Sequence, residues 1–376
     1  MLYNFFYDIL AILKVYEVIM KIEKLVAPLK NYLWGGTKLK NEYGKTTELD
    51  TVAESWELSF HKDGKTMLEN GNFLSDVVSK TDLGSNCDAF EFFPTLTKFI
   101  DAKDNLSIQV HPSDDYAISN ENSYGKTEMW YVVEADENAG IYLGLNKSVT
   151  TTEFETAIAN NTLTSILNYI PVKKGDCYFI PSGTIHAIGS GCLIYEIQQN
   201  SNLTYRVFDY NRKDANGNTR ELHVDKAKKV TNLNKFTPKQ LVASTVKGEV
   251  LGISKYFTAT KLVVSNPMKL TTFNSFCCVT CMGGHVDIEN ISLTKGESAF
   301  IPASYGKYEI SGNATLILTE VRKYSLVISS FDIKIVDDEK NVIYQAQCTK
   351  PNNETISNAL LNVNMTLNDI ENIIRI

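Results

Sequence analysis

Four side chains in three short segments have the residue types and the spacing to bind one divalent metal ion. Gln109 and His111 lie two residues apart in a short apolar stretch, so in a strand both side chains point to one face. Glu128 enters a run of aromatic and β-branched residues, where a buried carboxylate needs a metal or a charged partner. His186 closes the run that starts at Gly175, in which turn residues bracket an apolar strand. Two imidazoles, a carboxylate and an amide oxygen suit zinc foremost, with manganese, iron or cobalt as alternatives.

Each of these residues also has a structural explanation when it is taken alone. A single histidine such as His111 or His186 is more often a hydrogen-bonded core or surface residue than a metal ligand, and it is the combination that favours a metal site. A second candidate is weaker, because the C-x2-C pair Cys278 and Cys281 has only His285 nearby as a third ligand. A buried strand explains that pair better.

Composition indicates a globular, cytoplasmic protein. The 376 residues allow a large core and two or three domains, and seven cysteines without a disulfide-framework spacing predict reduced thiols. A net charge of -7 and a pI near 5.4 argue against nucleic acid as a partner. Residues 2–19 are apolar, but Asp8, Lys14 and Glu17 interrupt them. An amphipathic helix, or a translation start placed upstream of Met20, explains this segment better than a membrane anchor.

One sequence pattern occurs twice. The run 174–182 (KGDCYFIPS) returns as 295–303 (KGESAFIPA), with the same spacing from glycine to proline. Each copy reads as a turn, a strand and a second turn, a unit expected in antiparallel β barrels. The second copy has Tyr305 and Gly306 where a histidine would fall. The repeat therefore predicts two similar barrels, of which only the first carries metal ligands.

The segment from Gly175 to His186 fits the pattern G-x5-P-x-G-x2-H, which resembles the second cupin motif. Gln109 stands where the first cupin motif usually has histidine. That departure resembles the type I phosphomannose isomerases, in their compact bacterial form. The likeness covers about residues 24–320 and includes the following stretches: 31–36 (NYLWGG), 54–57 (ESWE), 93–100 (FPTLTKFI), 195–201 (YEIQQNS) and 205–212 (YRVFDYNR).

The resemblance implies one zinc ion per chain, other divalent metals being possible, with Gln109, His111, Glu128 and His186 as its ligands. It also implies that Arg206 is the catalytic arginine, which lies against charge that develops on the sugar oxygens of an enediol. The proton carrier stays open between Glu196, Lys126 and a metal-bound water.

Several polar residues beside the ligand segments are candidates for binding a hexose phosphate: Lys98, Ser107, Lys126 and Glu196. Lys98 and Lys126 could instead be solvated surface lysines. Asp209 and Arg212 are expected to pair with each other. The three tryptophans are expected to lie in the core rather than to stack against the sugar: Trp34, Trp56 and Trp130.

The expected fold is mainly β, with two cupin-like antiparallel β barrels (jelly rolls), a few helices and a small C-terminal α+β extension. The expected divisions are an N-terminal helical extension 1–23, a metal-binding catalytic cupin domain 24–221 with a helical insertion, a connection 222–246, a metal-free cupin-like domain 247–322 and an extension 323–376. Helical spacing predicts one helix within 148–170 and another that carries Leu360 to Ile374, and strands are expected at 325–328 and 342–344.

These features together predict a metal-dependent isomerase that interconverts mannose 6-phosphate and fructose 6-phosphate. Two alternatives remain. Cupins with two histidines and a carboxylate can hold iron for oxygen chemistry, although an oxygenase would not need cations beside its ligands. A sugar-phosphate-binding protein could keep the barrel without turnover, although Arg206 argues against that. The sequence does not decide the oligomeric state.

Overall fold

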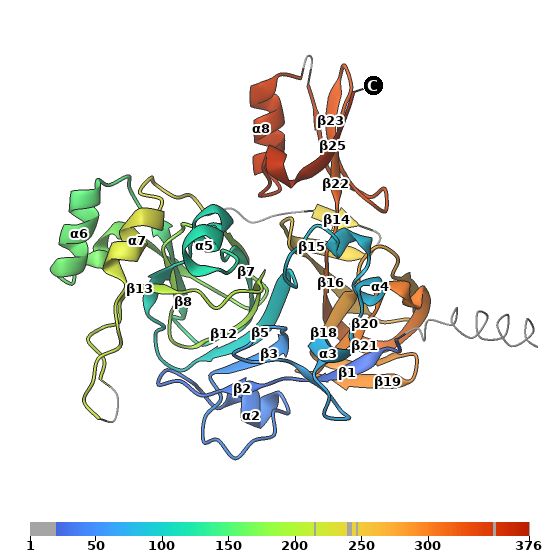
Figure 1. The fold of residues 1–376 in the computed structure, drawn as a ribbon, viewed down its shortest axis with the longest axis horizontal. Helices are drawn as coiled ribbons and strands as arrows, with labels where there is room; N and C mark the ends of the chain where they lie inside the picture. The colour runs from blue at the N-terminus through green and yellow to red at the C-terminus, as the bar shows by residue number, and fades with distance from the viewer. Residues whose placement is uncertain (1–19, 214–215, 239–242, 246, 349–350, 376) are drawn as a thin grey trace, which may run out of the picture.

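The computed structural model describes residues 20–213, 216–238, 243–245, 247–348 and 351–375. The helix expected near the N-terminus falls mostly on residues 1–19, which lie outside the described residues. Strands dominate, as predicted, and form four sheets (Figure 1). The helices are short and connect strands: α2 (Lys38–Glu42), α3 (Leu74–Val77), α4 (Lys80–Leu83), α5 (Asp114–Glu121), α6 (Thr151–Ala159), α7 (Val224–Val230) and α8 (Asn353–Leu361).

The first barrel consists of two antiparallel sheets that face each other across a shared core, on the left in Figure 1. Trp130 and Ile194 of one sheet pack in the same cluster as Leu143 and Ile188 of the other. The six-stranded sheet, in spatial order, contains β10 (Cys177–Ile180), β7 (Glu128–Ala135), β12 (Cys192–Gln199), β5 (Thr95–Ala102), β3 (Glu54–Leu58) and β2 (Leu29–Lys30). The five-stranded sheet contains β13 (Tyr205–Phe208), β6 (Ile108–Val110), β11 (His186–Ile188), β8 (Gly140–Leu145) and β9 (Leu167–Pro171).

A ten-stranded sheet forms the second barrel. Its two longest strands, β18 (Cys277–Ile288) and β21 (Lys307–Glu320), pair along their length and each takes further partners at both ends. The other strands are β14 (Ala243–Thr245), β15 (Gly248–Ile253), β16 (Thr258–Val264), β17 (Met268–Thr271), β19 (Ile291–Thr294), β20 (Ser298–Ile301), β1 (Glu23–Val26) and β4 (Met67–Leu68). Strands β1 and β4 pair here although they precede the first barrel's ligand segments in the chain.

The repeated sequence pattern corresponds to matching strands in the two barrels. The apolar stretch of the first copy is β10, which pairs with β7, and that of the second copy is β20, which pairs with β18. Each strand follows a glycine with positive φ, 91° at Gly175 and 89° at Gly296, a backbone conformation that glycine adopts without steric cost. The prediction of two barrels of related construction is thus confirmed.

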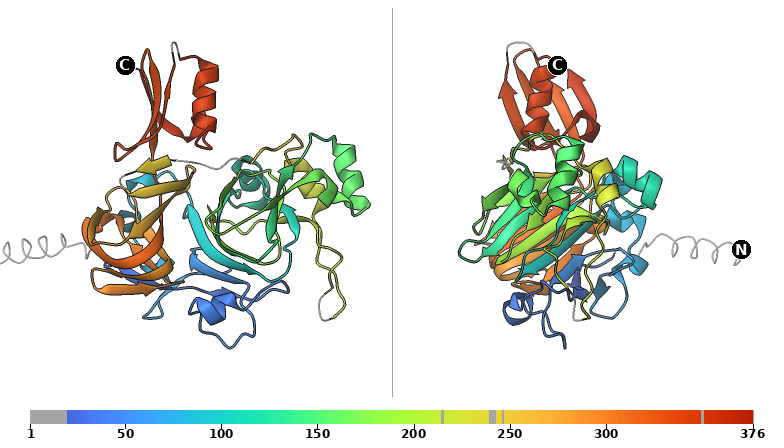
Figure 2. Two further views of the ribbon diagram at one scale, coloured as in Figure 1. Left: turned by 180° about the vertical axis from the view of Figure 1, so that it is seen from behind. Right: turned by 90° about the vertical axis from the view of Figure 1, so that its left-hand side faces the viewer.

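A small α+β unit follows the second barrel and projects from it (Figures 1 and 2). Its sheet has the order β24 (Val342–Gln347), β23 (Asp332–Asp337), β22 (Tyr324–Ile328) and β25 (Ile370–Arg375), and β25 runs parallel to β22. The core of the unit includes Ile356 and Leu360 of α8 and continues into Val250 and Ile253 of β15. The two strands predicted in this region are confirmed.

Two helix predictions were too long. The first helix, α6, ends at Ala159, where Asn161 takes a positive φ of 57°, and the remaining apolar residues form a short 3-10 turn and strand β9. In the tail, α8 ends at Leu361, and residues 370–375 form strand β25 instead. Their β-branched side chains suit a strand, and pairing with β22 outweighs the helical spacing of the sequence.

Cys278 and Cys281 lie within strand β18, and their side chains pack in two different apolar clusters. The buried-strand explanation of this pair is confirmed. The connection at 222–246 contains α7 and β14, so part of it is regular structure. No helix in the described part of the chain is long and apolar enough to cross a membrane.

Candidate metal centre

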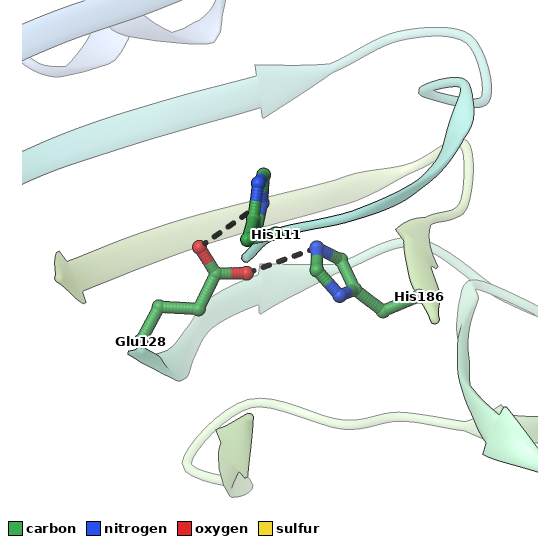
Figure 3. A group of neighbouring side chains, drawn as sticks. All are labelled: His111, Glu128 and His186. Atoms are coloured by element: carbon green, nitrogen blue, oxygen red, sulfur yellow. Dashed lines mark ion pairs between the residues drawn. The ribbon is translucent and has the colours of Figure 1, made fainter. Parts of the chain in front are cut away.

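Three buried side chains converge in the first barrel from three different strands. His111 follows β6, Glu128 begins β7 and His186 begins β11 (Figure 3). The Nε2 atom of His186 lies 3.1 Å from Glu128 Oε1, and that of His111 lies 3.6 Å from Glu128 Oε2. One ligand atom of each residue lies within 4.8 Å of the others. The carboxylate is therefore held between two imidazoles.

Backbone carbonyl groups fix the orientation of both imidazoles. The Nδ1 atom of His111 lies 2.6 Å from the Leu203 carbonyl oxygen, and that of His186 lies 2.8 Å from the Thr184 carbonyl oxygen. Because a carbonyl only accepts, each Nδ1 carries the hydrogen and each Nε2 is left with its lone pair facing Glu128. Burial, and then the charge of Lys126, holds the pKa of His111 well below its usual value, which keeps that imidazole neutral.

The arrangement fits a divalent metal ion. Glu128 is fully buried, and its two carboxylate oxygens face the two imidazoles and, at 2.9 Å, the ammonium group of Lys126. Burial raises the pKa of Glu128, but the charge of Lys126 foremost outweighs it, holds the pKa well below its usual value and keeps the carboxyl ionised. The Lys126 ammonium offsets part of the negative charge from one side, 2.9 Å from Glu128 Oε2 and 3.3 Å from His111 Nε2. A divalent cation bound by both imidazole lone pairs and the carboxylate would stabilise the centre further. Such an N, N, O set is typical of zinc and related ions, and hydrogen-bonded Nδ1 atoms are typical of metal-bound histidines.

Gln109, the fourth predicted ligand, lies at the same centre. Its side-chain amide nitrogen is 3.5 Å from His186 Nε2, and its backbone pairs with that of His186 between β6 and β11. Rotating the amide by half a turn exchanges nitrogen and oxygen, which would present the oxygen to the same position. The structure thus brings together all four residues predicted as ligands.

Alternating buried charges lead from the metal centre along the six-stranded sheet. Lys126 Nζ lies 2.9 Å from Glu128 and 3.4 Å from Glu196. Lys98 Nζ lies 3.2 Å from Glu196 and 3.4 Å from Glu54. Burial lowers the pKa of Lys98, but Glu196 and Glu54 outweigh it and raise the pKa above its usual value. Lys98 and Lys126 are 6% and 4% exposed, so their interpretation as solvated surface lysines was wrong.

Two tryptophan indoles hold the carboxylates of this chain of charges. Trp130 Nε1 donates to Glu196 Oε2 at 2.7 Å, and Trp56 Nε1 donates to Glu54 Oε2 at 2.7 Å. In each case one carboxylate oxygen is tied to an indole and the other faces a lysine. Both tryptophans are buried, which agrees with the prediction that they lie in the core.

A cavity of about 270 Å³ opens beside the metal centre. Its lining includes Gln109 and Glu196 together with four cations: Lys98, Lys126, Arg206 and Arg220. Arg206 Nε donates to Ser107 Oγ at 3.1 Å, and its guanidinium also donates to the Glu221 carbonyl oxygen at 3.0 Å. Burial and the nearby charge of Arg220 lower the pKa of Arg206. The cavity is therefore a small polar chamber with an excess of positive charge.

Sequence reasoning did not assign several residues of this chamber, among them two charged residues and a tyrosine. Glu54 lines it as the partner of Lys98, Tyr32 lines its aromatic side, and Arg220 brings the fourth cation. Glu54 was detectable as an acid that alternates with Trp56 in a buried strand, whereas Arg220 stands in a polar stretch with no periodicity. The expected pair of Asp209 and Arg212 forms at 2.5 Å, and Arg220 Nε also donates to Asp209 at 2.7 Å.

Comparison with known proteins identifies two family segments. Residues 22–147 match the model described as "Phosphomannose isomerase type I, catalytic domain", and residues 247–321 match "Mannose-6-phosphate isomerase, cupin domain". The mannose-6-phosphate isomerase of Streptococcus mutans is 35% identical over 305 residues, which cover 78% of this chain and 96% of that protein.

Solved structures agree with this result. The crystal structure of the mannose 6-phosphate isomerase from Bacillus subtilis gives a TM-score of 0.73 at 33% identity and covers 80% of this chain and 99% of that one. A mannose 6-phosphate isomerase solved with zinc and yttrium gives 0.65 at 16% identity, over 80% of this chain and 99% of that one, which supports the fold. With the fold, the repeated barrel and the buried His-Glu-His centre in agreement, the chain belongs to the type I phosphomannose isomerase family.

Proposed function

We propose that the chain is a zinc-dependent mannose-6-phosphate isomerase that interconverts mannose 6-phosphate and fructose 6-phosphate, with Gln109, His111, Glu128 and His186 as the metal ligands. The observation that carries the proposal is the position of the buried His-Glu-His centre beside a chamber lined by four cations. Membership of the family and the relatives' names support the same activity.

The reaction moves one proton between two neighbouring carbons of the sugar. A base removes the proton from C2 of the aldose, and an enediol forms as the O1 carbonyl oxygen gains a proton. A proton is then returned to C1 while the O2 hydroxyl loses its proton, which makes the C2 carbonyl of the ketose. Negative charge develops on the sugar oxygens during both steps, and the metal supplies electrostatic stabilisation of that charge when it is bound. The guanidinium of Arg206 lies in the chamber wall, where it stabilises the same charge.

Glu196 is the side chain we assign to the proton transfer. It lines the chamber, where Trp130 holds its Oε2 atom and the ammonium groups of Lys98 and Lys126 lie 3.2 and 3.4 Å from its Oε1 atom. Lys126, the alternative, lies between the carboxylates of Glu128 and Glu196, where its ammonium group balances their charge. That position suits an electrostatic role rather than proton abstraction.

The substrate is a dianionic hexose phosphate, and the charge of the chamber accounts for this class. Lys98, Lys126, Arg206 and Arg220 can bind phosphate and enediol oxygens together, and Ser107 holds the Arg206 guanidinium in place. An iron oxygenase has no need of such a concentration of positive charge, so the chamber favours the isomerase over that alternative.

The test is a coupled isomerase assay on mannose 6-phosphate before and after chelation, with zinc, manganese, cobalt or iron added back. We expect activity to disappear with the metal and to return with zinc. A protein that binds the substrate but shows no turnover with any of the metals would refute the proposal and favour the non-catalytic sugar-phosphate-binding alternative.

A further inference from the structure

Strand β25 forms an open edge of the C-terminal sheet. It follows β22 at the end of the strand order, and no strand of the described chain pairs with its other side. The opposite edge strand, β24, lies beside β14 of the second barrel. One edge of this sheet thus contacts the second barrel, whereas the other pairs with no described strand; the unit itself projects from that barrel (Figures 1 and 2).

The open edge combines exposed isoleucines with one charge of each sign, Glu371 and Arg375. Ile373 and Ile374 are 53% and 44% exposed, and the strand sequence IENIIR contains neither proline nor lysine. An edge strand with free backbone N–H and C=O groups and exposed apolar side chains is a template for a further strand. The composition of β25 therefore favours a strand partner over solvent.

The sequence of β25 is complementary to itself in the antiparallel direction. When two copies are paired about Ile373, Glu371 of each chain faces Arg375 of the other, and the two Ile373 side chains meet at the two-fold axis. Opposite charges and apolar residues directly across an antiparallel pair are stabilising, and a two-fold axis makes both charge pairs at once. Glu371 lies 2.9 Å from Lys323 of its own chain. In the pair, its carboxylate would therefore be shared between this lysine and Arg375 of the second copy.

The geometry of the unit allows this pairing. Ile373 is in register with Leu326, whose side chain packs in the same core as Leu360 of α8, so Ile373 lies on the helix-covered face. A two-fold axis perpendicular to the sheet keeps both α8 helices on one side of the joined sheet. The two Ile373 side chains then meet on the face that carries both helices. The register with β22 is regular from Asn372 to Arg375, which leaves a straight edge for the partner.

From these observations we infer that the C-terminal unit joins two copies of this chain through antiparallel β25 edges, forming one eight-stranded sheet across a two-fold axis. The family match ends at residue 321, and the Streptococcus mutans relative covers 78% of this chain while 96% of its own length is matched. The C-terminal unit, and with it the proposed interface, therefore lies outside the part of the chain that matches the family. The isomerase chamber lies in the first barrel and does not include a residue of this unit.

The inference is tested by measuring the mass of the full chain in solution by light scattering or sedimentation. A protein concentration of about 100 µM is needed, because a six-residue strand pair is a small interface with a Kd on the order of micromolar. We expect twice the mass of one 42.1 kDa chain. Glu371→Arg alone and Arg375→Glu alone place like charges across the axis and should each give monomers. An equimolar mixture of the two single variants restores both charge pairs and should return the double mass, as should the double exchange within one chain.

The matched control is Glu137→Arg, which makes the same charge change on an exposed turn of the first barrel and should leave the double mass intact. Circular dichroism confirms that each variant is folded, and hydrogen exchange should show β25 amides protected in the wild type and less protected in either single variant. A wild-type chain that is monomeric at this concentration would overturn the inference. A double mass that survives both single exchanges, or a mixture that stays monomeric, would overturn it as well.

Discussion

At the scale of single residues, the site combines a candidate metal centre with a row of buried ion pairs, and the two predict different effects of substitution. The imidazoles of His111 and His186 are oriented by backbone carbonyls so that their Nε2 atoms face Glu128. The row that includes Lys98 and Glu196 is oriented by indole N–H groups instead. Substitutions in the first set should therefore affect metal content, and those in the second set should affect turnover.

Arg206→Ala and His186→Ala separate these effects. We expect Arg206→Ala to lower kcat by about 100-fold or more while the metal content stays full, because a cation that stabilises developing charge is lost. His186→Ala should lose both metal and activity. Metal analysis beside steady-state kinetics measures both effects, and Arg206→Lys, which keeps the charge without the planar fork, is the matched control. Equal metal loss in the two alanine variants would contradict the role given to Arg206.

Trp130→Phe tests the hydrogen bond that orients Glu196. The variant keeps an aromatic ring against His186 but removes the indole donor, which lies 2.7 Å from Glu196 Oε2. We expect kcat to fall about 10-fold, the equivalent of about 1.4 kcal/mol for a hydrogen bond to a charged group, with little change in metal content. Trp56→Phe is the parallel variant for Glu54 and Lys98. A loss of metal that matches the loss of activity in Trp130→Phe would show that the indole supports His186 instead.

At the scale of elements, glycines with positive φ form the two turns of the segment that carries His186. Gly175 starts the turn into β10 with φ of 91°, and Gly183 turns the chain toward β11 with φ of 82°. The backbone of Gly183 donates to the His111 carbonyl oxygen at 2.8 Å and accepts from Asn232 at 2.8 Å. This glycine thus links the segment that carries His186 with the one that carries His111.

Alanine substitutions at these two glycines should differ in a defined way. A Cβ at Gly175 meets no atom within 4 Å, so Gly175→Ala should cost only backbone strain, about 1–2 kcal/mol of the free energy of unfolding. A Cβ at Gly183 would lie 2.9 Å from the Val230 carbonyl oxygen, which adds about 1 kcal/mol or more and displaces the loop before His186. Urea unfolding and metal affinity measure the difference. Equal costs at the two positions would contradict the contact with Val230.

At the scale of the whole molecule, a buried charge network joins the C-terminal unit to the second barrel. Arg322 is 7% exposed and lies 2.7 Å from both Glu320 and Glu339. Lys247 lies 3.0 Å from Glu339, and Asn86 donates to Asp338 at 2.8 Å. The hairpin between β23 and β24 is therefore fixed to the barrel by charged and polar contacts beside the shared apolar core.

The network predicts a pH dependence of docking. Burial raises the pKa of Glu339, but Arg322 and Lys247 outweigh it and lower the pKa below its usual value of 4.5. A carboxyl with a lowered folded pKa contributes stability that is complete above the unfolded pKa and is lost as the pH falls below it. The protection factors of amides in the C-terminal unit, which correct for the pH dependence of unprotected exchange, should thus be high at pH 7 and fall as the pH drops below about 4.5. Arg322→Ala should raise exchange already at pH 7, and Arg322→Lys should do so less; unchanged exchange in both would contradict the docking role.

Much of this protein could be predicted from its sequence, because the decisive signals are local. Alternation places Gln109 and His111 on one strand face, and turn residues around β10 specify its ends, so the barrel repeat and the ligand types follow from short stretches of chain. The tertiary structure decided what depends on contacts between distant residues. Pairing with β22 makes a strand of a segment whose spacing is helical, and ion pairs with Glu54, Glu128 and Glu196 bury lysines that the sequence leaves ambiguous. Local sequence determines the spacing of apolar and turn residues along a segment. Burial, charge partners and strand pairing depend on residues distant in the sequence, which only folding brings into contact.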